Sequence, residues 1–572
     1  MQLKAVPKTI NEIFSLNTKY VVPRFQREYS WNDEQIIDFW DDIIAAMTVD
    51  SKAKKVSGSE YFIGPLVLIG DDSSPSYSIV DGQQRLTTVT VLLRALVSAL
   101  EATGDKAAAD ALYYNYVEGK DNEGNPYFKL QNETPKPFFQ KAIQNRKQVK
   151  TLKASSDEER ALLRVAEIFS GLLSPSSLAV RFSGIPADVA LRGIRDQVLS
   201  FLKVVYISVI EEDDAYAIFE TLNARGLNLS STDLIKNTLL RRMKETHPND
   251  DAKDEWNKLR TSLAKCGSDI DTFIRHYWNS KFSHSSEDRL YKNFKKAIQA
   301  KKIKSERDFL DDLLAECERY RKIARPDRKD WKEKHKLLLY RALEALDVFR
   351  VTQPRPFIMA VLASQHANDT LKKVALLAIE NFHFAYTAIC SLRASGMDSK
   401  YGSAARDLRA AKSAPKAKAV INDLIAELKV KMPKRDVFVG KFFGINVSGN
   451  DERQRRVVQY FFKRLETYHH GGFELVPEDL SIEHIEPQSG KAAHAGAIGN
   501  LLPLAGGLNS IAGSKAFSAK LVEYKKSKFR EVAMFCSTHV GTTKWGKTEI
   551  DKRTKELGEL AYEKIFVLES AK

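Results

Sequence analysis

Cysteine is scarce in this sequence, and its cysteines have no spacing typical of a metal site. Cys266, Cys317, Cys390 and Cys536 are far apart and form no C-x-x-C pair. This excludes a zinc ribbon and a disulfide-stabilised miniprotein, and it fits a reducing compartment. The sequence also lacks the roughly 18 consecutive apolar residues of a transmembrane helix and an apolar signal core near its start. We therefore expect a cytoplasmic protein with no membrane partner.

Charge is unevenly distributed along the 572 residues. Residues 1–250 hold 30 basic and 33 acidic side chains, whereas residues 251–572 hold 59 and 41. A positive second half can attract a polyanion, most commonly nucleic acid, although the same excess can serve solubility alone. With 43 % hydrophobic and 28 % charged residues, the chain is typical of a soluble globular protein of about two to four domains.

Hydrophobic periodicity predicts an α+β protein that is mostly helical. Tyr61–Gly70 and Tyr77–Val80 favour two strands of a hairpin, and Leu86–Leu100 favours a helix directly after it. Phe201–Ile210 favours another strand, and residues 250–440 are helical almost throughout. Further helices are predicted over residues 212–222, 231–243 and 451–466. No internal repeat interrupts this organisation.

Polar residues suited to phosphodiester chemistry gather near the C-terminus. Glu483 and His484 adjoin on a predicted short strand, Asn500 follows in a short apolar segment, and Asn509 lies where a helix is expected to begin. Lys515 is expected within that helix. A neutral imidazole can take a proton from water, and a hard cation prefers carboxylate and amide oxygens. A lysine near the phosphate would add to the stabilising field.

This segment resembles the HNH, or His-Me finger, nuclease motif, in which a β-hairpin and a helix surround one metal ion. The resemblance implies that His484 is the general base and that Glu483 and Asn509 bind Mg²⁺ or another divalent cation. Asn500 matches the central asparagine, which braces the loop, and Lys515 completes the expected catalytic set. Glu483 stands where many HNH motifs have aspartate. His469, His470 and His494 show no partner pattern, and we interpret them as surface residues.

A second motif, Asp81-Gly82-Gln83-Gln84-Arg85, lies between a predicted strand and a predicted helix. Gly82 permits a tight turn, and the N-terminus of the helix offers N–H groups and a positive dipole end to an anion. The glutamines suit polar edges, and Arg85 suits a phosphate. Asp81 suits a magnesium ion, although capping the helix is the simpler alternative.

Two further stretches accompany this motif. Arg24, Gln26 and Arg27 lie in PRFQREYSW, and Asn223 and Arg225 lie in FETLNARGLNLSSTDLIK. With FIGPLVL and DGQQR, these stretches resemble the ParB-like DGQQR domain of the GmrSD-type, modification-dependent (type IV) restriction endonucleases. The resemblance spans about residues 7–240.

The resemblance implies a bacterial defence enzyme that cuts phage or modified double-stranded DNA. Residues 81–85 become candidates for binding a nucleoside triphosphate, with possible hydrolysis. The arginines and polar residues of the other two stretches are candidates for the same pocket or for sensing the DNA modification, and the two roles stay open.

We therefore expect a ParB-like α/β domain at residues 1–245, a helical linker or DNA-contacting region at 246–440 and an HNH domain at 441–572. A single HNH site cuts one strand, so a double-strand break requires a homodimer or two successive nicks. The competing hypothesis is a nucleotide-driven DNA-binding switch with a degenerate HNH clamp. A purely structural adaptor leaves both motifs unexplained.

Overall fold

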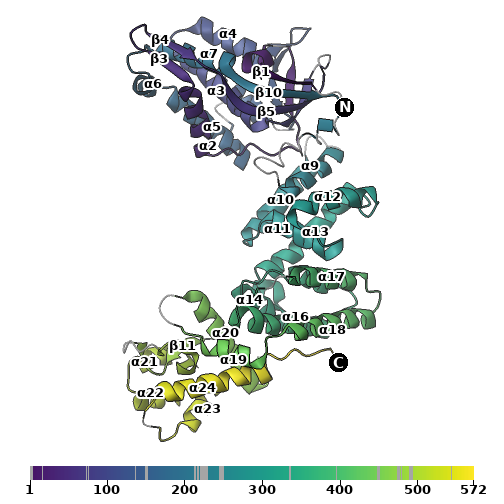
Figure 1. Ribbon diagram of the computed structural model, residues 1–572, viewed down its shortest axis with the longest axis vertical. Coiled ribbons are helices and arrows are strands. Elements are labelled where there is room, and N and C mark those ends of the chain that lie inside the picture. Colours follow the sequence, from purple (N-terminus) through teal and green to yellow (C-terminus); the bar gives the residue numbers. More distant parts are fainter. Residues whose placement is uncertain are drawn as a thin grey trace. The chain divides into compact units, whose positions relative to one another are not determined.

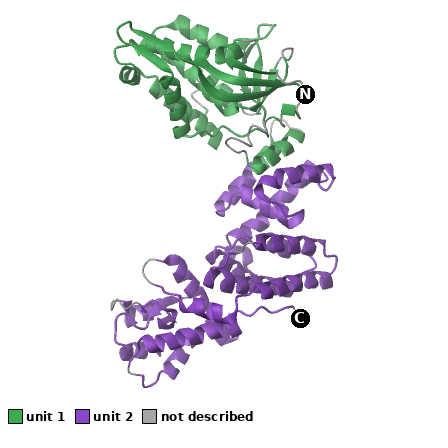
Figure 2. Ribbon diagram, in the orientation of Figure 1, with its two compact units in different colours: residues 1–256 green, residues 257–572 purple. Residues whose placement is uncertain are grey.

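The computed structural model describes residues 4–571, apart from 16, 72–73, 75, 135–136, 148–151, 212–213, 216–217, 219–229, 244–249, 334–335, 394–395, 448–450, 473–476, 478, 489–493 and 543. The chain divides into two compact units, residues 1–256 and 257–572 (Figure 2). Most described residues are helical, and the strands lie mainly in the first unit, as expected for an α+β, mostly α chain.

The first unit is built on a six-stranded mixed sheet with the order β1-β10-β5-β6-β2-β9 (Figure 1). Its strands are β1 (Lys4–Thr9), β2 (Lys19–Val22), β5 (Tyr61–Ile69), β6 (Ser76–Asp81), β9 (Leu130–Asn132) and β10 (Leu202–Val209). Strands β5 and β6 form the predicted antiparallel hairpin, with Ile69 opposite Ser78. Two short pairs lie outside the sheet: β3 (Met47–Asp50) with β4 (Lys55–Gly58), and β7 (Glu118–Lys120) with β8 (Pro126–Phe128).

Helix α3 (Gln83–Ala102) is the central helix of this unit, and the predicted helix after the hairpin is thereby confirmed. Its side chains Leu86, Val89, Leu93 and Leu96 are buried in the main hydrophobic cluster. The surrounding helices are α1 (Ile10–Phe14), α2 (Asp33–Ala45), α4 (Lys106–Tyr116), α5 (Asp157–Leu172), α6 (Pro175–Arg181), α7 (Ala187–Asp196) and α9 (Ser231–Arg242). The helix predicted over residues 212–222 lies mostly outside the described residues.

The described residues of the second unit are mainly helical, with one small hairpin and an isolated bridge between Asn446 and Ala497. Helix α10 (Asp251–Lys265) crosses the boundary between the units. The helices that follow are α11 (Ile270–Lys281), α12 (Glu287–Gln299), α13 (Glu306–Ala324), α14 (Leu337–Val348), α15 (Arg355–Ala363), α16 (Asp369–His383), α17 (Met397–Ala410), α18 (Ala414–Lys431), α19 (Arg435–Phe443) and α20 (Glu452–His470). This confirms the predicted helical middle.

The chain after α20 forms a compact C-terminal segment. Strands β11 (Ser481–His484) and β12 (Leu501–Leu504) are followed by α21 (Gly506–Ala512), α22 (Phe517–Tyr524), α23 (Arg530–Thr538) and α24 (Lys547–Leu560). A separate hydrophobic cluster, which includes Ile485, Leu502, Tyr524 and Phe535, joins the hairpin to these helices.

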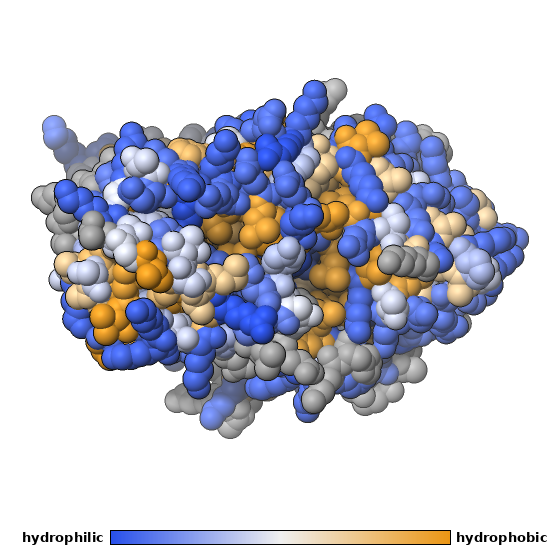
Figure 3. Space-filling view, turned by 90° about the horizontal axis from the view of Figure 1, so that it is seen from below, coloured by the Kyte–Doolittle hydropathy of each residue, from blue (hydrophilic) through white to orange (hydrophobic). Residues whose placement is uncertain are grey.

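The described surface is mixed in polarity. In Figure 3, hydrophilic side chains surround separate apolar patches on the face in view. Scattered apolar side chains are ordinary on a globular surface, so we assign that face no partner. No described helix has the length and hydrophobicity of a membrane-spanning segment. All four cysteines are buried and unpaired.

Candidate functional site

His484 ends strand β11, opposite Leu501 of β12 in an antiparallel register. The amide of Ile485 extends the pairing by donating to the Asn500 carbonyl at 2.9 Å. Successive side chains of a strand point to opposite faces, so His484 and Glu483 are directed to different surroundings. The expected hairpin around His484 is thus present.

The imidazole of His484 is half-buried and has one polar neighbour at its Nε2. That nitrogen lies 2.9 Å from Nε2 of Gln488, which also donates to the Val447 carbonyl at 3.0 Å. Because an amide NH₂ only donates, Nε2 of His484 accepts this hydrogen bond, and its lone pair is directed at Gln488. Burial lowers the pKa of His484 below its ordinary value, helped by the charges of Lys520 and Arg455, while the Val447 carbonyl opposes the shift.

If His484 is the general base that the HNH resemblance implies, the pH profile of DNA cleavage should report this neutral imidazole. Protonated His484 cannot accept a proton, so the acidic limb of kcat/KM is expected below the ordinary pKa of 6.5. Arg455→Gln removes a nearby positive charge, and we expect it to move the limb to higher pH. High salt should abolish the difference between the two proteins because Arg455 is exposed. An acidic limb above pH 6.5 in the wild type would contradict this assignment.

Glu483 points into the interior of the C-terminal segment. Its Oε1 accepts hydrogen bonds from Lys520 Nζ at 2.7 Å and from the Tyr524 hydroxyl at 2.8 Å. Lys520 also donates to the His484 carbonyl at 2.5 Å. The side chains of Glu483 and Lys520 are 4 % and 1 % exposed, so the ion pair is dry. The Oε1 atom of the carboxylate expected to bind a metal is therefore already held by an ammonium.

Asn500 is completely buried, and both ends of its amide are satisfied. Its Oδ1 accepts from the Glu486 amide at 2.8 Å and from Trp545 Nε1 at 3.1 Å. Its Nδ2 donates to the carbonyls of Glu486 and Ala495 at 2.9 and 2.7 Å. These bonds tie the segment after β11 to β12, which is the bracing role expected for this asparagine.

Asn509 lies in a helix as expected from the sequence, whereas Lys515 does not. Asn509 lies in α21, and its Nδ2 donates to Ser481 Oγ at 2.8 Å and to the Ile482 carbonyl at 3.1 Å. The expectation that Lys515 lies within that helix is wrong, because Gly513 adopts a positive φ of 45° and α21 ends at Ala512. Lys515 instead lies between helices and pairs with Glu523 at 3.4 Å.

The neighbouring histidines correct a second expectation. His469 Nε2 lies 3.1 Å from buried Glu531, and His494 Nε2 lies 2.8 Å from Glu486. The His470 side chain is 9 % exposed. They are therefore not free surface residues. The Glu531 pKa, which burial alone would raise, is lowered by His469 and by Arg553.

In the first unit, the two N-terminal motifs meet at one edge of the sheet. Strands β2 and β6 are parallel, so the segments that follow them begin at the same edge. Gln83 Nε2 donates to the Arg27 carbonyl at 2.7 Å. Gln84 Nε2 donates to the Glu28 carbonyl at 3.0 Å, and its Oε1 accepts from the Ser30 amide at 2.9 Å. Both glutamines thus hold residues 27–30 over the start of α3.

Most of the other polar side chains of these motifs also form hydrogen bonds or ion pairs within the protein. Arg85 Nη2 lies 3.3 Å from the Asp81 carboxylate. Arg24 is buried, pairs with Asp250 at 2.6 Å and donates to the carbonyls at the end of α9. Gln26 is also buried and donates to the Val80 carbonyl at 3.1 Å. Arg27 is exposed. Asn223 and Arg225 lie outside the described residues.

Gly82 allows the tight passage from β6 into α3. Its φ is 92°, and a Cβ there would lie 2.8 Å from Leu66 Cδ1 and 3.1 Å from the Pro65 carbonyl oxygen. We expect Gly82→Ala to lower the free energy of unfolding of the chain by about 1–3 kcal/mol, measured by urea denaturation. Gly124→Ala is the matched control, since Gly124 has a φ of 85° with open space around it. Equal losses for the two variants would contradict the crowding at Gly82.

Sequence reasoning missed Gln488, Lys520 and Tyr524. Gln488 had a local signal, since it lies four residues after His484. Lys520 and Tyr524 had none in the sequence around Glu483, because they reach it from α22, 37 and 41 residues along the chain.

Two protein-family models match the chain. One, described as the GmrSD restriction endonuclease N-terminal domain, matches residues 10–240. The other, described as the GmrSD restriction endonucleases C-terminal domain, matches residues 433–560. No curated protein gives a match. The two matched regions contain the polar network of the first unit and the His484 hairpin.

Proposed function

Since the chain belongs to the GmrSD restriction endonuclease family, we propose that it hydrolyses DNA at His484, within an HNH-type site that its N-terminal unit controls. Membership makes the chain a restriction endonuclease of phage defence that acts on DNA. The site, its metal ion, the preference for modified DNA and the nucleotide control are the proposal.

The arrangement of His484 is the observation that carries the proposal. Its Nε2 carries the lone pair of a half-buried imidazole whose pKa is lowered, and this lone pair accepts a hydrogen bond from Gln488. Once the Gln488 amide moves off Nε2, His484 takes a proton from water there, the water oxygen forms a bond to phosphorus, and the P–O bond to the leaving sugar oxygen breaks. That oxygen then takes a proton from solvent. Gln488 orients the imidazole, and Asn500 holds the segment that carries both.

A divalent cation fits the site through Asn509 more readily than through Glu483. The amide nitrogen of Asn509 is engaged by β11, so its Oδ1 faces away from those partners. No cluster of three or more His, Cys, Asp or Glu side chains among the described residues could hold a metal ion. Mg²⁺ does not require one, because it keeps several waters and takes substrate phosphates as ligands. When bound, the cation would stabilise the charge on the phosphate.

The start of α3 is the proposed nucleotide site. Gly82 has no side chain that could cap the helix, so an anion could take the place of a cap at its first N–H groups. Gln83 is buried, and its Oε1 has no hydrogen-bond partner in the described part of the chain. The carbonyl that Gln83 binds belongs to Arg27, whose side chain is exposed. A triphosphate at the helix start would be recognised by these groups, and a modified base in DNA is the alternative ligand.

One observation favours the alternative function, a nucleotide-driven DNA-binding switch. Lys520 occupies the carboxylate that the HNH motif would use for a metal. Such a protein would bind DNA without cutting it, and its N-terminal unit would carry the activity.

Cleavage of supercoiled plasmid and phage DNA tests the proposal. The full chain is incubated with Mg²⁺ or Mn²⁺, with and without ATP or GTP, on modified and unmodified DNA. We expect cutting that requires the cation, is strongest on modified DNA and changes with the nucleotide. Absence of cutting on every substrate, with DNA binding retained, would overturn the nuclease proposal in favour of the switch. The ratio of nicked to linear product reports whether one or both strands are cut.

A further inference from the structure

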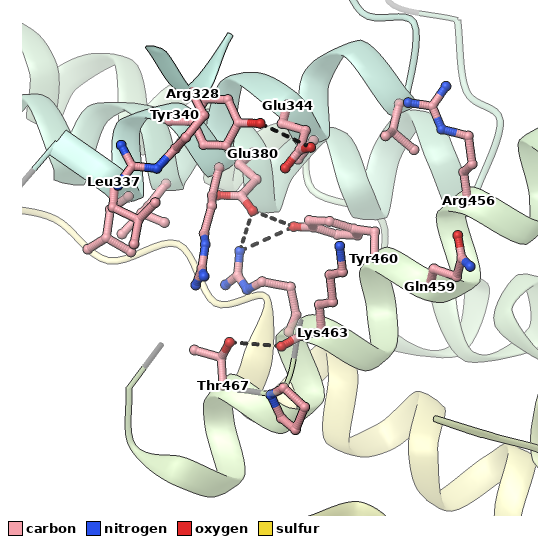
Figure 4. Close-up of a pocket in the computed structure, with 17 residues that line it drawn as sticks. Arg328, Leu337, Tyr340, Glu344, Glu380, Arg456, Gln459, Tyr460, Lys463 and Thr467 are labelled. Atoms are coloured by element: carbon pink, nitrogen blue, oxygen red, sulfur yellow. Dashed lines mark hydrogen bonds and ion pairs between the residues drawn. The ribbon is translucent and has the colours of Figure 1, made fainter. Parts of the chain in front are cut away.

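A cavity of about 420 Å³ lies in the second unit between α14, α16 and α20. Figure 4 shows Glu380 and Tyr460 converging at its centre, with Tyr340 and Glu344 on one side and Lys463 on the other. The volume falls within the range of about 300–1,000 Å³ that is typical of small-molecule sites. None of the residues discussed for the nuclease site or for the N-terminal motifs lines it.

The wall of the cavity is strongly basic. Five cationic side chains line it, against two carboxylates; they are Arg328, Arg341, Arg456, Lys463 and Arg464, against Glu344 and Glu380. Arg464 is neutralised by Glu380 at 2.6 Å. Arg456 and Lys463 are exposed, and neither side chain has an ion pair within the described residues. Two cations on one face of α20 are thus available to an anion.

Helix α14 also lines the cavity with apolar and aromatic side chains, beside its Arg341 and Glu344. Leu337, Leu338 and Val348 of α14 line it together with Leu377 of α16. Tyr340 is half-buried and hydrogen-bonds to Glu344 at 3.4 Å, and its ring stacks on no other described ring. A bare phosphate needs no such wall. A ligand with a flat ring at one end and a phosphate at the other would satisfy both halves of the cavity.

The helix that supplies the free cations also contacts the nuclease hairpin. Gln459 lines the cavity, and its Nε2 lies 3.5 Å from the Leu480 carbonyl, just before β11. Arg455, one residue before Arg456, contributes to the lowered pKa of His484. A ligand in the cavity would therefore contact the same helix that borders the proposed catalytic base.

We propose that this cavity binds a nucleoside phosphate, with Arg456 and Lys463 on the phosphate and Tyr340 on the base. The ligand is either a free nucleotide or one nucleotide unit of a DNA strand, since both present the same chemistry. The cavity is separate from the proposed nucleotide site at α3, and ligand binding in it does not require that the protein cleaves DNA.

Equilibrium binding to the full chain tests this site. ATP binding is measured by calorimetry, and binding of a fluorescent oligothymidylate by anisotropy. The test variant carries both Arg456→Glu and Lys463→Glu. We expect this double variant either to bind one equivalent of ATP fewer than the wild type does, or to bind oligothymidylate about tenfold or more weakly. The first result identifies a free nucleotide, and the second identifies a DNA strand. Tyr340→Leu should weaken the same binding without a change of charge.

The matched control is Lys412→Glu/Lys416→Glu, which changes the net charge equally at exposed lysines outside the cavity. Unchanged binding of both probes by the cavity variant would overturn the proposal, as would an equal loss in the control. If thermal melting shows that the cavity variant does not fold, Lys463→Gln replaces it. Because binding is measured without cleavage, an inactive wild-type nuclease would leave the result interpretable.

Discussion

Replacing His484 by alanine is expected to reduce DNA cleavage by about 10²- to 10⁴-fold, the usual contribution of a general base. The variant loses the imidazole Nε2 that would take the proton from water, while the hairpin keeps its backbone pairing with β12. DNA binding and the thermal melting temperature should change little, since His484 is half-buried at the end of its strand. Initial cleavage rates on plasmid DNA measure the effect.

His366→Ala is the matched control, because His366 is an exposed histidine of the same unit, outside the nuclease segment. It should cut like the wild type. Imidazole added to the His484→Ala protein should restore part of the rate, which a purely structural role of His484 does not predict. Full nicking by His484→Ala would show that another group activates the water.

Replacing Lys520 by methionine is expected to lower the free energy of unfolding of the second unit by about 3–5 kcal/mol, because it leaves the buried Glu483 carboxylate without its counter-ion. Tyr524 would remain as a donor to that carboxylate, and the His484 carbonyl would lose its Lys520 hydrogen bond. Chemical denaturation, followed by circular dichroism, measures the loss.

Two further variants separate the buried pair from a general effect of lysine. Lys515→Met removes an exposed partner of Glu523 in the same segment and should cost less than about 1 kcal/mol. Glu483→Gln/Lys520→Met should recover more than half of the loss, because the neutral amide that replaces the carboxylate needs no counter-ion. Equal losses for Lys515→Met and Lys520→Met would contradict the assigned burial of this pair.

Some helices and strands could be predicted from the residues within each element alone. The strands at β5, β6 and β10 were predicted from short apolar runs, and the helix α3 from apolar residues at helical spacing. The β11–β12 hairpin and the bracing by Asn500 followed from a resemblance carried by a compact motif. The break at Gly513 was missed, although glycine commonly ends a helix.

The hydrogen-bond and ion-pair partners of the site residues could not be predicted in this way, because they come from distant parts of the chain. Gln83 and Gln84 were expected to face a ligand, which stays a prediction; their amide nitrogens bind the carbonyls of Arg27 and Glu28, because parallel β2 and β6 end at one edge of the sheet. Arg24 was expected at the same pocket, but it is buried against Asp250.

The sequence alone determined that His484 is the best candidate for a general base and that Asp81–Arg85 joins a strand to a helix. The tertiary structure alone decided which lysine lies at the β11–β12 hairpin, because it places Lys520 rather than Lys515 against Glu483. The physical reason is that a strand sends Glu483 and His484 to opposite faces, and only the packing of α22 decides what the inner face meets.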